Sequence, residues 1–372
     1  MKVPSPARYL LALVAFMLVA LVPAAVRAQD ARGALTNLPE SQAVLYINAR
    51  RLINEAAPAV MPPEVLNKAL ADAKQFIDLN GLEYVIAGAR LKGDLSAKQM
   101  PEFLLIIRGS FSAEALLSGA RMLAPDMHTQ ETAGTKTLSV FSFNKAAPTA
   151  GSGQNAKKFP VDQIAAVALD ANTIAVGIPA YLRDAIDNTG GGRPRLKPEL
   201  VDLALRDANT LVSLVADLPP GISGHLRAMG APANAEMERM VDAVRQVQLA
   251  VNMQPSTFGV QSIVRMDDAE KATALNGLIN MGVGFLKGEL RKDLQKAGGK
   301  PKDDTAATLA VLESLTNAAR DNEVELNVSF QQAALAETIK RQFAPKKQET
   351  APAPGANKGA PAKRRPARRR NR

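Results

Sequence analysis

The stretch from Gln246 to Leu290 limits the possible folds of this chain more than any other, because it combines a strand, a turn, a second strand and a helix pattern. Strict alternation from Gln246 to Met253 is typical of a half-buried strand. One side of this strand would carry Val247, Leu249, Val251 and Met253, and the other Gln246, Gln248, Ala250 and Asn252. Gln254-Pro255-Ser256 favours a turn, and alternation resumes from Phe258 to Met266. We therefore predict an antiparallel hairpin with its aliphatic side toward the core.

A helix is predicted directly after this hairpin. Asp267 is the expected N-cap, with Glu270 at the third helical position. Apolar residues then recur at three- and four-residue steps and predict one stripe against the sheet, made of Ala272, Leu275, Ile279, Val283 and Leu286. Gly277, Gly282, Gly284 and Gly288 lie in the same helix, and each weakens it by roughly 1 kcal/mol relative to alanine. We expect these glycines to allow close packing of the helix on the sheet.

The same order of elements occurs earlier in the chain. Strand patterns at 84–91 and 103–108 precede a helix with Ser112 as its N-cap, and Arg108 holds the place that Arg265 holds in the later hairpin. A strand is expected before each hairpin, at 43–48 and 211–216, and a strand with a short helix after it, at 173–186 and 324–339. The sequence thus predicts an α+β fold with two copies of a split β-α-β, ferredoxin-like plan, antiparallel sheets and helices packed on one face.

The first repeat is expected to span residues 29–206 and the second 207–344, with a mobile insertion rich in Gly, Ser, Ala and Lys at 144–160. The unbroken apolar run of the strand at 43–48 predicts a central position, covered on both sides.

The first 28 residues have the pattern of a secretory signal peptide. Lys2 and Arg8 precede an apolar run from Tyr9 to Val22, and Val26-Arg27-Ala28 supplies small residues for a signal peptidase. We predict export to the periplasm or the extracellular space, with a mature chain that begins near Gln29. The alternative is an uncleaved helix that anchors the protein in the inner membrane. The chain contains no cysteine, so disulfide, thiol and Cys-zinc chemistry are excluded.

The net charge of +10 is concentrated at the C-terminus. Residues 345–372 hold ten basic side chains and one acidic one, whereas residues 29–344 are nearly neutral. Proline, alanine and charge dominate this tail, so we expect it to be disordered. Its candidate polyanion-binding residues are Lys363, Arg364, Arg365, Arg368, Arg369 and Arg370. Behind a signal peptide, the predicted partners are anionic lipid, lipopolysaccharide or acidic polysaccharide rather than a specific nucleic acid, and a solubilising tail without a partner is the alternative.

Residues 38–48, Leu-Pro-Glu-Ser-Gln-Ala-Val-Leu-Tyr-Ile-Asn, are followed by Arg51-Leu52-Ile53. This opening resembles uncharacterised secreted bacterial proteins that are known mainly as conserved domains of unknown function. The resemblance extends through most of the body, including 85–90 and 247–253. It implies an exported protein and supplies no catalytic residues.

No pattern in the chain indicates a catalytic, cofactor or metal site. His128 and His225 lie in polar contexts without further ligands at metal spacing, and Asp126 near His128 is better explained as a solvated loop. The carboxylate pairs 267–268 and 303–304 stand where helices begin, and the glycine runs 151–153 and 190–192 lack the surroundings of a phosphate loop. We predict that the second of these glycine runs ends a helix.

One surface of the body is a candidate contact region. Gln248, Asn252 and Gln261 would place amides on neighbouring strands of the outward sheet face, although a merely solvated face is the simpler explanation. We interpret the chain as an exported, non-catalytic binding or structural protein of the bacterial cell envelope. The alternative is a secreted or periplasmic hydrolase whose active site shows no sequence motif.

Overall fold

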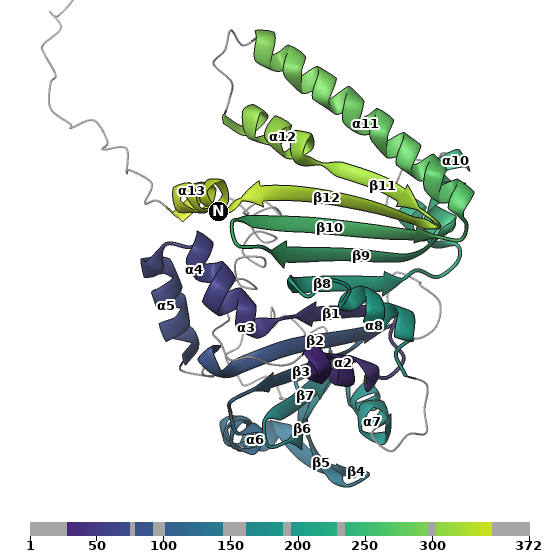
Figure 1. The fold of residues 1–372 in the computed structure, drawn as a ribbon. Coiled ribbons are helices and arrows are strands. Elements are labelled where there is room, and N and C mark those ends of the chain that lie inside the picture. Colours follow the sequence, from purple (N-terminus) through teal and green to yellow (C-terminus); the bar gives the residue numbers. More distant parts are fainter. Residues whose placement is uncertain are drawn as a thin grey trace, which may run out of the picture.

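The strands of the protein form one antiparallel sheet, shown by a computed structural model in Figure 1. The structure describes residues 28–74, 79–91, 101–143, 161–188, 195–228, 235–296 and 303–343. Within these ranges, the sheet contains 12 strands in the order β11-β12-β10-β9-β8-β1-β2-β3-β7-β6-β5-β4. The strands are β1 (Ala43–Ile47), β2 (Leu82–Arg90), β3 (Glu102–Gly109), β4 (His128–Ala133), β5 (Lys136–Ser142), β6 (Gln163–Asp170), β7 (Thr173–Gly177), β8 (Thr210–Asp217), β9 (Val244–Met253), β10 (Thr257–Met266), β11 (Thr316–Arg320) and β12 (Glu323–Gln331).

Helices connect these strands in both halves of the chain. A continuous helical stretch near the N-terminus consists of α3 (Ala49–Arg51), a π-helical turn η1 (Leu52–Ala56) and α4 (Ala57–Val60). The other helices are α2 (Ala28–Thr36), α5 (Pro63–Lys74), α6 (Ala113–Leu123), α7 (Pro179–Asn188), α8 (Pro198–Ala204), α9 (Ile222–Ala228), α10 (Ala235–Asp242), α11 (Ala269–Lys296), α12 (Asp303–Ser314) and α13 (Gln332–Phe343). Two 3-10 turns lie between these elements, η2 (Leu79–Gly81) before β2 and η3 (Pro125–Met127) before β4.

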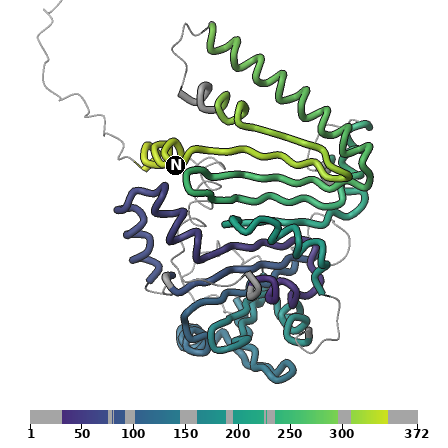
Figure 2. Tube along the Cα trace, viewed as in Figure 1, coloured from purple at the N-terminus to yellow at the C-terminus, as the bar shows by residue number. Residues whose placement is uncertain are grey.

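The two halves meet at the pair formed by β1 and β8, where Val44 lies opposite Val215. From this pair, β2, β3 and β7 follow outward on one side, and β9, β10 and β12 on the other. The order of strands is therefore mirrored about the β1–β8 pair, and Figure 2 shows the two halves of the trace continuing one sheet. The predicted boundary after residue 206 falls just before β8; that the halves are copies of one another stays a prediction.

The predicted ferredoxin-like order of strands within each half is wrong. A split β-α-β unit contains parallel neighbours, whereas β1 pairs directly and antiparallel with β2, and β2 with β3. Mixed helix and strand content with an antiparallel sheet is confirmed. The order of helices and strands along each half is close to the predicted one, but most strands pair with a neighbour in sequence; β1 with β8, β3 with β7 and β10 with β12 are the exceptions among the described strands.

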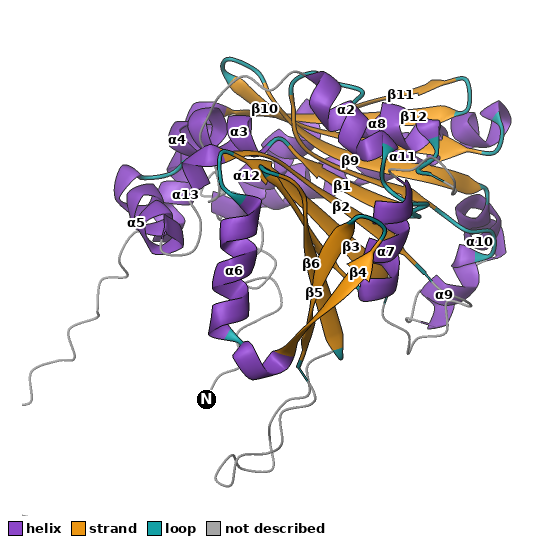
Figure 3. Ribbon diagram, turned by 90° about the horizontal axis from the view of Figure 1, so that it is seen from below, coloured by secondary structure: helices purple, strands orange, loops and turns teal. Residues whose placement is uncertain are grey.

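The helices also cover both faces of the sheet, not one (Figure 3). On the first face, α2, α7 and α8 pack over Val44, Tyr46 and Ile86. On the second face, the helices from α3 to α5, with α13, pack over Leu45 and Ile47. Successive residues of β1 thus alternate between two cores, which confirms its predicted central position.

Local signals placed several elements well. Ser112 accepts a hydrogen bond from the Ala115 backbone N–H at 3.2 Å and caps α6, as predicted. The N-cap of α11 is Asp268, one residue after the predicted Asp267. Asp268 accepts a hydrogen bond from the Lys271 backbone N–H at 2.8 Å, so Lys271 and not Glu270 holds the third helical position. In this arrangement Asp267 instead pairs with the side chain of Lys271.

The glycines of α11 do not serve close packing on the sheet. A Cβ atom added at Gly277, Gly282, Gly284 or Gly288 would meet no atom within 4 Å. Ala272, Leu275 and Ile279 do pack toward the sheet with Val264 and Val324, whereas Leu286 is exposed. The expected stripe is therefore correct in its first half only.

Two polar strands, β4 and β11, were not predicted. Both lie at the edges of the sheet, where residues such as Gln130 and Thr316 are exposed and leave no alternating apolar pattern. Residues 1–27, the insertion at 144–160, the glycines at 190–192 and the tail at 345–372 lie outside the described residues.

Candidate functional site

The first face of the sheet carries a polar groove over β9, β10, β12 and β11. The antiparallel register places Asn252 opposite Gly259 and Gly259 opposite Ser329, so these positions share a face. Gln261 and Asn327 are opposite one another on the same face. A hollow of about 390 Å³ lies here, and its polar lining includes Asp207, Asn252, Gln254, Thr257, Gln261, Ser314, Thr316, Asn327 and Ser329.

The three amides predicted for this surface differ in their placement. Asn252 and Gln261 both line the groove, on neighbouring strands. The expected exposure of Gln248 is wrong, since only 1% of this residue is accessible and its Nε2 donates to the backbone oxygen of Leu203 in α8 at 2.5 Å. Asn252 is also buried, and its Oδ1 accepts a hydrogen bond from the Thr210 hydroxyl at 3.0 Å.

The inward and outward sides of β9 are reversed at this point. Helix α8 covers the amide side, while Leu249 on the aliphatic side remains 49% exposed beside Leu214 of β8. Alternation shows that a strand has two different sides, but the covering helix decides which of them is buried.

Gln261 is the central residue of the groove. Its Nε2 donates to Glu325 Oε1 at 2.7 Å, and Asn327 Nδ2 donates to the same oxygen at 2.9 Å. The hydrogen bond from Asn327, opposed by burial and supported by Gln261, lowers the pKa of Glu325, which is therefore an ionised acceptor at neutral pH. Gln261 Oε1 is buried and has no hydrogen-bond partner in the described part of the chain. An unpaired buried acceptor costs about 1–3 kcal/mol, so a donor placed there would be favoured.

The groove continues past Glu325 into a hollow of about 350 Å³ lined by Arg206, Arg265, Arg320, Asp321, Asn322, Glu323 and Glu325. Arg265 Nη2 lies 2.6 Å from Glu323 Oε1, and Arg206 Nη1 lies 2.7 Å from Glu323 Oε2. Burial alone would raise the pKa of Glu323, but the hydrogen bonds from Arg265 and Arg206 outweigh it and lower the pKa. Arginines and carboxylates balance in this part of the groove, which gives it no strong preference for a polyanion.

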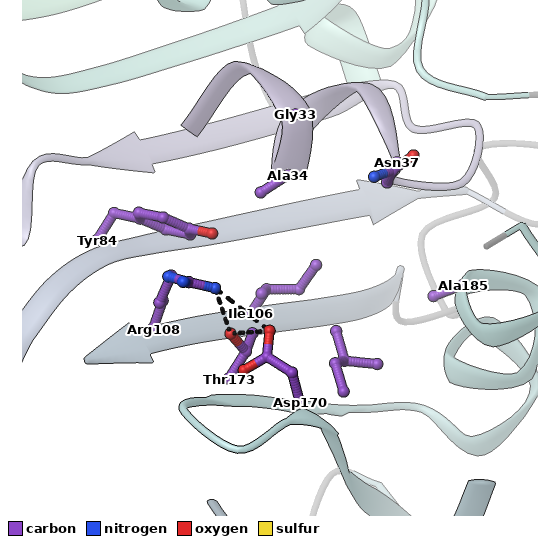
Figure 4. A pocket seen from close by; sticks show the side chains of 10 residues that line it. Gly33, Ala34, Asn37, Tyr84, Ile106, Arg108, Asp170, Thr173 and Ala185 are labelled. Atoms are coloured by element: carbon purple, nitrogen blue, oxygen red, sulfur yellow. Dashed lines mark hydrogen bonds and ion pairs between the residues drawn. The ribbon is translucent and has the colours of Figure 1, made fainter. Parts of the chain in front are cut away.

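A separate hollow on the same face, about 360 Å³ in volume, lies in the first half beside Arg108 (Figure 4). Arg108 Nη1 donates to Asp170 Oδ2 and to the Thr173 hydroxyl, both at 3.2 Å, and Nε donates to Glu83 at 3.1 Å. Gly33, Ala34 and Asn37, from α2 and the residue after it, line the hollow opposite Tyr84. Two carboxylates already pair with this guanidinium, so Arg108 ties strands together rather than presenting an anion site.

The positions of Arg108 and Arg265 correspond, as the sequence predicted. Arg108 stands between Tyr84 and Thr173 in the ladder, and Arg265 stands between Gln246 and Glu323. Each arginine therefore lies on the third strand outward from the centre and bonds to a side chain on the fourth.

The two histidines of the chain lie on different elements. His128 begins β4, where Nδ1 lies 3.1 Å from the Ala124 backbone oxygen and the ring faces Phe141. His225 is in α9, and its side chain lies outside the described residues. The described ranges contain no cluster of three His, Asp or Glu residues that could hold a metal ion. In the same ranges, no helix has the length and apolar character needed to cross a membrane.

The candidate tail residues, from Lys363 to Arg370, also lie outside the described residues, so polyanion binding by the tail stays a prediction. The signal peptide likewise remains a prediction from the sequence.

Comparisons with known proteins identify no family. No family model matches the chain, and no curated protein does. Among solved structures, three crystal forms of the protein TP0453 align over most of the chain. Form III has 11% identity and a TM-score of 0.39, and the alignment covers 82% of this chain and 97% of that one. Form IV has 11% identity and a TM-score of 0.41, and the alignment covers 82% of this chain and 95% of that one. Form I has 8% identity and a TM-score of 0.39, with coverages of 83% and 97%.

Proposed function

We propose that this is an exported, non-catalytic binding protein of the bacterial cell envelope, whose polar groove binds extended polypeptide segments of low net charge. The pattern of residues 1–28 supports export. The groove supports the choice of ligand, because it follows the strands and offers amides and hydroxyls that both donate and accept.

The single observation that carries this proposal is the half-satisfied side-chain amide of Gln261. Its Nε2 is bound to Glu325, while its buried Oε1 faces no donor among the described side chains and backbone groups. An extended peptide presents one N–H and one C=O per residue, and an N–H from such a chain would satisfy this oxygen once the buried amide turns toward the groove. At about 3.4 Å per residue, the ten residues of β10 run alongside roughly eight to ten residues of an extended ligand.

The chemistry of the lining argues against two other ligand classes. No aromatic ring lines either hollow of the groove, so the stacking surface that sugar rings and bases use is lacking within these described walls. Arginines paired with Glu323 leave little net charge to attract a polyanion. A peptide whose side chains are uncharged or balanced in charge fits this lining better.

The test is an array of eight-residue peptides of neutral composition, probed with the full mature chain. Gln261→Met preserves side-chain length and removes both hydrogen-bonding atoms, so binding should weaken about tenfold, which corresponds to one lost hydrogen bond of about 1.4 kcal/mol. The matched control is Gln130→Met, at an exposed glutamine on β4 at the far edge of the sheet. Equal binding by both variants, or binding of a glycan array in place of peptides, would reject the peptide proposal.

A further inference from the structure

Helix α11 carries two apolar stripes, of which only one packs against other described parts of the chain. The first stripe packs Ala272, Leu275 and Ile279 against the sheet. The second contains Leu278, Met281 and Phe285, and it is turned to solvent, with Met281 66% and Phe285 69% exposed. Figure 1 shows α11 as the outermost element beyond β11. Large apolar side chains grouped in this way on a solvent-exposed surface mark an interaction site.

The spacing of the second stripe is that of a helix-pairing seam. Ala274, Leu278, Met281, Phe285 and Gly288 follow one another at steps of four, three, four and three residues. This alternation repeats every seven residues and keeps one face of a helix against another helix along its length. A lipid surface requires only a broad apolar side and sets no such repeat.

Glycines provide space beside this seam. Gly277 and Gly284 lie four residues before and three residues after Met281, which makes them its neighbours on the helix surface. An added Cβ at either position meets no atom within 4 Å, so a bulky side chain from outside could approach the backbone there. The same glycines would reduce the apolar area available to a membrane, and this favours a helix as the partner.

We propose that the partner is α11 of a second copy of this chain. The seam combines projecting side chains, Met281 and Phe285, with recesses at glycines, and a surface that holds both kinds of feature can fit its own copy about a two-fold axis. From Ala272 to Leu286 the helix contains no charged residue. Two identical seams can therefore meet without like-charge repulsion, and no oppositely charged partner is called for.

The test measures self-association of the full mature chain by sedimentation equilibrium at micromolar concentration. The wild-type protein should be a dimer, and Phe285→Glu should raise the dissociation constant at least tenfold by placing a carboxylate in the seam. Because Phe285 is largely exposed, the fold should not depend on it, and circular dichroism checks this. Leu123→Glu is the matched control, since Leu123 of α6 is even more exposed and lies outside the seam.

A monomeric wild-type protein would overturn the proposal, and so would an unchanged dimer in Phe285→Glu or equal dissociation in Leu123→Glu. Flotation with vesicles of phosphatidylethanolamine and phosphatidylglycerol distinguishes the membrane alternative. A monomer that floats with these vesicles only when Phe285 is present would assign the stripe to a lipid surface and reject self-association.

Discussion

The hydroxyl oxygens of Ser41 and Tyr181, 140 residues apart in the sequence, lie 2.5 Å from one another in the core of the first half. The Tyr181 hydroxyl also lies 3.3 Å from the Glu40 backbone oxygen, and the guanidinium of Arg90 stands 4.3 Å from the centre of its ring. Arg90 in turn pairs with Glu102 and Asp184, each at 2.6 Å. Burial raises the pKa of Tyr181, and the phenol is therefore neutral across the physiological range. These contacts join α7 to the chain before β1 and to β2 and β3.

Gly88 is the residue that makes room for this contact. A Cβ at position 88 would lie 2.8 Å from Ser41 Oγ and 3.1 Å from the Tyr181 hydroxyl. Gly88→Ala should therefore lower the free energy of unfolding, by about 1–3 kcal/mol, as overpacked cores do. Gly282→Ala is the control, because a Cβ there meets nothing within 4 Å and should raise stability by about 1 kcal/mol. Urea titration of both variants measures the difference; stabilisation by Gly88→Ala would refute the close contact.

Glu323 should make stability depend on pH in the acidic range. Its pKa is lowered in the folded protein, so its contribution is complete above the unfolded value of about 4.3 and is lost as the pH falls through the folded pKa. Glu323→Gln should be less stable than the wild type at pH 7, and the gap should narrow as the pH falls below 4.3. Urea midpoints across this range provide the measurement. Glu313→Gln, which breaks an exposed pair with Arg291, should show little effect at any pH; a gap that stays constant for Glu323→Gln would contradict the prediction.

The N-terminal helix should remain in the mature protein. Mass spectrometry of the exported chain should find a start at or near Gln29, and an intact Met1 would show instead that the leader is retained.

Leu35 of α2 is fully buried in the core beneath α8. Leu35→Ala should therefore cost about 2–5 kcal/mol of unfolding free energy, whereas Ala substitution at exposed Arg32 should cost less than 1 kcal/mol.

The basic tail should account for any retention on polyanions. A chain truncated after Ala344 loses ten basic side chains, while the remaining body is nearly neutral. We expect the full mature chain, but not the truncated one, to be retained on heparin or on anionic vesicles at low salt, and high salt should release it. If the two forms are retained equally, the tail is not the binding element.

Sequence alone determined the elements that depend on neighbours within a few residues. Alternation located β9 and β10, and Ser112 located the start of α6. These signals are strong because strand sides, caps and first turns involve residues close in the chain. The correspondence of Arg108 with Arg265 was visible for the same reason.

Only the tertiary structure decided which side of each strand is buried and which polar residues meet. Gln248 is inside and Leu249 half outside because α8, some 45 residues earlier, covers one side of β9. The contact of Gln261 with Glu325 follows from the pairing of β10 with β12, which are 64 residues apart at that point. Polar edge strands such as β11 exist only because β12 supplies their hydrogen bonds, and no local pattern records a partner so distant.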